Sequence, residues 1–129
     1  MPLVNLNDVN ARLLGQPVKD MYAGMVSARN GITALAGGGQ ANAIAVTAQV
    51  NRVTTVATAA DSIKLPPAVP GQWPIVIINA AAANSMNVFP STGDAINALS
   101  ANTAFAMAAN TTAIFFCAVA GTWNSVLTA

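Results

Sequence analysis

From residue 43 onward the chain consists of short β-type runs separated by turn residues, and this pattern limits the fold more than any other feature. The runs lie at 43–50, 51–59, 61–66, 75–78, 85–89, 95–99, 103–107 and 113–119, with a last one through Trp123. About seven to nine strands at intervals of about 8 to 12 residues predict an all-β fold, a jelly-roll-like antiparallel β-sandwich. No helical pattern separates the runs and no strict repeat is visible, so we favour the sandwich over a parallel α/β sheet or a solenoid.

Two of these runs are apolar at nearly every position. They read IVII at 75–78 and AIFFCAV at 113–119. A strand with one solvated face alternates apolar and polar residues, whereas a continuous apolar run is typical of a strand that is covered on both faces. The sequence therefore predicts that both faces of these two strands are covered.

The composition limits the surface of the molecule. The 129 residues are enough for one domain, but only 7% are charged, against about 25% in an ordinary protein. Hydrophobic residues make up 54%, and the net charge is +1. No basic field is present, so we expect neither a nucleic acid nor a membrane partner. Either Asn, Thr, Ser and Gln coat the surface, or another protein covers it; we favour the second explanation.

The charges also divide the chain. Residues 1–30 hold five of the nine charged side chains, and the glycines of the 31–40 segment follow them. We therefore expect an N-terminal arm (1–30) with a short helix over 18–29, a Gly-rich joint (31–40) and a β-sandwich domain (41–129). The alternative for the arm is a frayed terminus. Its apolar residues are predicted to contact a partner: Leu3, Val4, Leu6, Leu13, Leu14, Met21, Tyr22 and Met25.

Few residues offer chemistry. Asp94 lies in PSTGD at 90–94, where Gly and Asp favour a tight turn, and we expect a hairpin tip rather than a catalytic loop. Asp61 also follows a turn, and no second acid stands near either in sequence, as a paired-carboxylate hydrolase requires. With no histidine and only Cys117, a zinc site is excluded and the cysteine reads as a small buried hydrophobe. We therefore expect no enzyme, no metal and no cofactor.

The aromatic residues offer one candidate for ligand contact. Trp73 stands in a proline-rich loop beside Gln72, where an indole can stack on a base or a sugar. The alternative is that Trp73, like Trp123, is a packing anchor.

Targeting segments are also not expected. The first ten residues have neither the basic nor the apolar region of a signal peptide. The longest apolar run, 113–120, is shorter than the roughly 20 residues that a membrane-spanning helix needs.

Two segments carry a family resemblance. They are NRVTTVATAADSIKLPPAV at 51–69 and IVIINAAAANSMNVFPSTGDAINALSANTAFAMAANTTAIFFCAVAGTWNSV at 75–126. Their turn and core patterns resemble those of the cement, or decoration, proteins of tailed-bacteriophage capsids, and the N-terminal arm is not part of the shared pattern. The resemblance implies a jelly-roll-like fold and a virion protein on the outer surface of the capsid, produced in the bacterial host cytoplasm.

In that role the chain would bind across major capsid protein subunits, stabilise the phage head and form a homo-oligomer, a dimer or a trimer. An alternative is a head-fibre or tail-associated module that binds a receptor or a glycan through Trp73.

Overall fold

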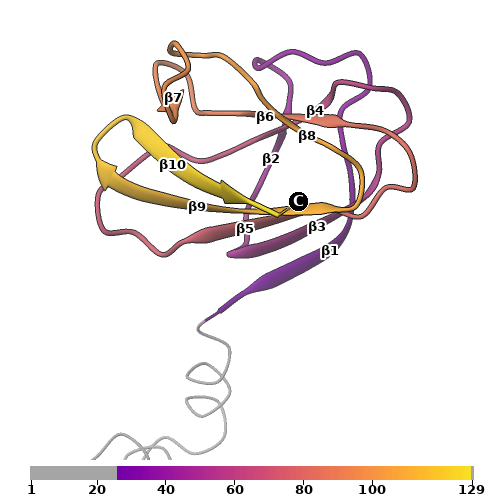
Figure 1. The fold of residues 1–129 in the computed structure, drawn as a ribbon, viewed down its shortest axis with the longest axis horizontal. Coiled ribbons are helices and arrows are strands. Elements are labelled where there is room, and N and C mark those ends of the chain that lie inside the picture. The colour runs from indigo at the N-terminus through magenta and orange to yellow at the C-terminus, as the bar shows by residue number, and fades with distance from the viewer. Residues whose placement is uncertain (1–25, 129) are drawn as a thin grey trace, which may run out of the picture.

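The computed structural model describes residues 26–128, which form ten strands in two packed sheets and contain no helix (Figure 1). The six-stranded sheet has the order β1-β3-β5-β9-β10-β7, and the four-stranded sheet has the order β2-β4-β6-β8. The strands are β1 (Ala28–Thr33), β2 (Ile44–Ala45), β3 (Val50–Thr55), β4 (Asp61–Lys64), β5 (Ile75–Asn79), β6 (Met86–Phe89), β7 (Ala95–Ile96), β8 (Phe105–Met107), β9 (Thr111–Val119) and β10 (Thr122–Leu127). The all-β class is confirmed. β2 to β10 lie in or overlap the expected runs, but the run at 43–50 contains only the two-residue β2 and the first residue of β3, and β1 was not expected.

The chain passes from one sheet to the other and back, and each pass adds a parallel strand. β1, β3 and β5 pair in parallel in one sheet, and β2, β4 and β6 pair in parallel in the other. Each pair of passes is one coil of a β-solenoid, so the predicted antiparallel jelly-roll sandwich is wrong. Parallel neighbours usually need a long crossover, often a helix. Here the strand in the opposite sheet serves as the crossover between two parallel neighbours. Parallel pairing is therefore possible without helices, which the sequence argument did not consider.

The coils differ in length. Residues that pair between stacked parallel strands are one coil apart in the sequence. Ala28 pairs with Val50, and Val50 pairs with Val76. In the opposite sheet, Ile44 pairs with Ile63. One coil therefore takes about 19 to 26 residues, a range typical of solenoid repeats. Because the corners vary in length, the sequence shows no fixed period.

The last strands reverse direction and close the stack of coils. β8 pairs antiparallel with β6, and β9 pairs antiparallel with β5. β10 then forms a hairpin with β9, and the short β7 lies parallel to β10 at the edge of the sheet. The solenoid thus ends in a mixed sheet.

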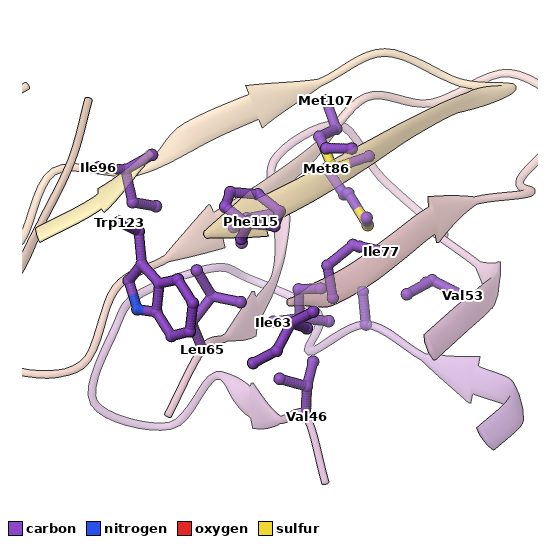
Figure 2. Close-up of a cluster of buried hydrophobic side chains, with 14 of the residues drawn as sticks. Val46, Val53, Ile63, Leu65, Ile77, Met86, Ile96, Met107, Phe115 and Trp123 are labelled. Carbon is purple, nitrogen blue, oxygen red and sulfur yellow. The ribbon is translucent and has the colours of Figure 1, made fainter. Parts of the chain in front are cut away.

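Between the two sheets lies a single apolar core, to which both contribute (Figure 2). Phe115 and Trp123 are its largest fully buried side chains, and Phe105 packs edge-on against Phe115 with ring centroids 5.8 Å apart. The Trp123 indole N–H donates to the Pro66 carbonyl at 3.2 Å, which satisfies its one polar atom. Other fully buried members are Val53, Ile63, Ile77, Met86, Val88, Ile96 and Met107.

The N-terminal predictions fall mostly outside the described residues. Most of the expected helix over 18–29 lies there, and its last two residues, Ala28 and Arg29, begin β1. β1 runs across the expected boundary between arm and joint. Gly37, Gly38 and Gly39 of the joint lie in the turn from β1 to β2, whereas Gly31 belongs to β1. Gly38 has a positive φ, and a Cβ there would lie 3.2 Å from the Ala60 carbonyl oxygen.

Candidate functional site

The Asp61 carboxylate at the start of β4 has a structural role: it accepts hydrogen bonds from the turn that precedes the strand. Its side chain is 1% exposed and accepts the N–H groups of Ala57 and Thr58 at 2.9 and 3.1 Å. The Thr58 hydroxyl donates to its other oxygen at 2.7 Å. The hydrogen bonds from the Thr58 hydroxyl and amide lower the pKa of Asp61 below its ordinary 3.8, although burial opposes them. An ionised, fully bonded carboxylate holds the turn before β4.

Asp94 also has a structural role. Its amide donates to Ser91, as the predicted tight turn requires, but the turn joins β6 of one sheet to β7 of the other. It is therefore not the tip of a hairpin. One carboxylate oxygen accepts the Ala68 amide at 2.8 Å, and the Asp94 carbonyl accepts the Asn102 amide at 2.8 Å. Asp94 thus ties together two loops that are far apart in the sequence.

The remaining candidates for chemistry are dispersed. Cys117 is buried on the inner face of β9, as expected, and its thiol lies 3.2 Å from the Val119 carbonyl. Within residues 26–128, no three His, Cys, Asp or Glu side chains come together in a way that could hold a metal ion. That part of the chain also contains no helix long and apolar enough to span a membrane. The remaining candidates for function among the described residues are two surface features, an exposed apolar sheet face and a groove.

The outer face of the six-stranded sheet is apolar across four strands. Val50 of β3 pairs with Val76 of β5, which pairs with Ile114 of β9, which pairs with Val126 of β10. Paired residues point to the same side of a sheet, so these four side chains form a continuous row. The outer apolar face consists of this row with Ile78 and Phe116 beside it. Val126 is 63% exposed and Phe116 is 42% exposed.

This face changes the interpretation of the two apolar runs. In β5 and β9 the inward side chains are buried, but the outward ones are only half-buried or exposed. The prediction that both faces are covered therefore fails for the described residues taken alone. The nearest charged neighbour on the face is Arg52, which stands opposite Ile78 and donates to the Asn30 side chain at 3.1 Å. The outer side of the six-stranded sheet is thus apolar, and no segment within residues 26–128 packs over it.

Trp73 is exposed and lines a groove of about 430 Å³. The groove lies between two stacked corners of the solenoid: residues 46–49, which lead into β3, and residues 65–74, which lead into β5. Thr47 and Gln49 come from the first corner, and Pro66, Gln72 and Trp73 come from the second. The sequence singled out Trp73 and Gln72, but nothing in it placed 46–49 opposite them, because the solenoid stacking was not foreseen.

The predicted arm contacts cannot be placed in this geometry. Leu3, Val4, Leu6, Leu13, Leu14, Met21, Tyr22 and Met25 all lie outside the described residues. Comparisons with protein-family models, with curated proteins and with solved structures found no match to this chain.

Proposed function

We propose that this chain is a structural virion protein, a capsid cement protein that binds across neighbouring major capsid protein subunits and stabilises the phage head. It acts as a homo-oligomer on the outer surface of the capsid and catalyses no reaction. The N-terminal arm predicted over residues 1–30 clasps the shell, and the apolar side chains that precede β1 make the contacts there. The sequence resemblance motivates this proposal.

The observation that carries the proposal is the outer apolar face. Its central strands have the sequence of strands buried on both sides, yet among the described residues only their inner side is buried. Contiguous exposed apolar surface of this kind marks protein interfaces. Such an interface contains few charges, and Arg52 at its margin is already engaged by Asn30. A protein surface of similar polarity is the partner that this face fits.

The proposal is tested with heads of the encoding phage that are produced without this protein. Purified chain is added back, and bound protein is measured by co-sedimentation with the heads. Wild-type protein should bind and should raise the temperature at which the heads release DNA. Val126→Asp places an unpaired charge in the row that the capsid would cover, so we expect binding to fall at least about tenfold.

A matched variant separates the face from a general effect of charge. Ala106→Asp adds the same charge at an exposed position of β8, in the four-stranded sheet, and should bind like the wild type. A version that begins at Val26 retains all ten strands and should fold but bind weakly. If the wild type does not bind to heads, or if Val126→Asp binds as tightly as Ala106→Asp, the proposal is wrong.

A further inference from the structure

We propose that the groove beside Trp73 is a binding site for a neutral carbohydrate. This inference is independent of the cement role, because the groove and the outer apolar face use different residues. The groove's volume of about 430 Å³ falls within the range of roughly 300–1,000 Å³ that is usual for small-ligand sites.

The solenoid creates the groove through unequal corners. The corner over 46–49 is short, whereas the next corner over 65–74 carries several additional residues and extends beyond it. In repeat folds, insertions in single repeats gather on one face, which is often the binding face. Trp73 of the longer corner lines the groove together with residues 46–49 of the shorter one, and Trp73 is 58% exposed.

Both walls of the groove are fixed before any ligand arrives. The Gln49 carbonyl accepts the Val76 amide, and the Gln49 amide donates to the Ser27 hydroxyl at 3.2 Å. In the long corner, the Gly71 amide donates to the Cys117 carbonyl at 3.0 Å, and Pro74 follows Trp73 directly. A rigid wall orders little on binding, so less of the interaction free energy is lost.

The polar groups of the groove match a sugar. The Gln49 side-chain oxygen accepts the Ser27 amide, and the Gln72 side-chain nitrogen donates to the Pro67 carbonyl. The side-chain nitrogen of Gln49 is then left as a donor, and the side-chain oxygen of Gln72 as an acceptor, with no partner among the described residues. Sugar hydroxyls both donate and accept, and the C–H face of a pyranose ring stacks on an indole. No charged side chain lines the groove. The Arg29 guanidinium reaches its edge, where it donates to the Thr47 hydroxyl and the Ala45 carbonyl at 3.5 Å each. Since the lining itself is neutral, it favours a neutral ligand over an anionic one.

The test uses a printed array of bacterial surface polysaccharides, together with hexasaccharides of glucose and of N-acetylglucosamine in solution. Binding in solution is measured by isothermal titration calorimetry for every variant, because the Trp73 variants lack the indole whose fluorescence could otherwise report binding. We expect at least one neutral glycan to bind, and Trp73→Ala to weaken that binding at least about tenfold. Trp73→Phe should retain part of the affinity, because a smaller aromatic ring still stacks.

Phe116→Ala is the matched control, since it removes an exposed aromatic from the outer apolar face instead. It should leave glycan binding unchanged, while Trp73→Ala should leave head binding unchanged. The proposal is overturned if no glycan binds at concentrations up to about 10 mM, an affinity too weak to matter. It is also overturned if Trp73→Ala leaves glycan binding intact. Loss of head binding in Trp73→Ala, without any glycan binding, would show that the groove contacts protein.

Discussion

Phe115 and Phe116 are adjacent on β9 and point to opposite sides of the six-stranded sheet, so truncating each one separates folding from association. Phe115 is 0% exposed, and Phe115→Ala should destabilise the fold by about 3–5 kcal/mol. Phe116 keeps 42% of its surface exposed. Full burial of a phenylalanine contributes about 1.5–3 kcal/mol, so Phe116→Ala should cost the fold only about 1–2 kcal/mol. The remaining exposed part supplies about 1 kcal/mol to an interface, or about a fivefold change in affinity per copy.

The two effects are measured separately. Urea unfolding of the purified variants gives the free energy of unfolding, and co-sedimentation with heads gives the affinity. Phe116→Ala should be the more stable variant and yet bind more weakly than the wild type. The reasoning is refuted if Phe116→Ala loses as much stability as Phe115→Ala, because the ring would then be covered within its own chain. It is equally refuted if Phe116→Ala binds to heads with wild-type affinity.

Three further outcomes follow from the same structure. The lowered pKa of Asp61 means that its contribution to stability is complete above its ordinary pKa of 3.8 and is lost as the pH falls through the lower folded value. Urea unfolding between pH 7 and pH 2.5 should therefore show a steeper acid loss in the wild type than in Asp61→Asn; equal slopes would contradict this. Asn79 is fully buried and donates to three carbonyls, those of Asn84, Met107 and Ala108. Asn79→Leu should cost about 3 kcal/mol or more, whereas the exposed Asn124→Ala should change stability by about 0.5 kcal/mol or less; similar values for the two would be inconsistent with the network. Head binding should change little between 50 and 500 mM salt, since few charges flank the outer apolar face; a steep loss measured by co-sedimentation would point to ion pairs instead.

The approximate positions of β2 to β10 could be predicted from the sequence because they depend on local information, whereas β1 was not expected. Alternation and β-branched residues marked β3, β4 and β6, while Pro90 and Gly121 marked turns. The burial of Cys117 also followed from its neighbours in the strand. These features need only a few residues of context.

Strand pairing could not be predicted in the same way. An antiparallel sandwich and a two-sheet solenoid use the same short strands and the same turn residues, and they differ in which strands pair. The long corner over 65–74 makes one coil longer than the one before it, so no repeat appears in the sequence. The same limit applies to the groove beside Trp73. Trp73 could be identified in the sequence by its residue type, whereas Gln49 could be found only from the stacking of the two corners.

The central claim is that another protein covers the outer apolar face. Under the proposed cement role, a cryo-electron microscopy map of the intact phage particle tests it most directly. We expect the chain to lie on the capsid with Ile114, Phe116 and Val126 packed against a capsid subunit or a second copy of the chain. A map in which these three side chains face solvent, or in which the chain is absent from the shell, would contradict it.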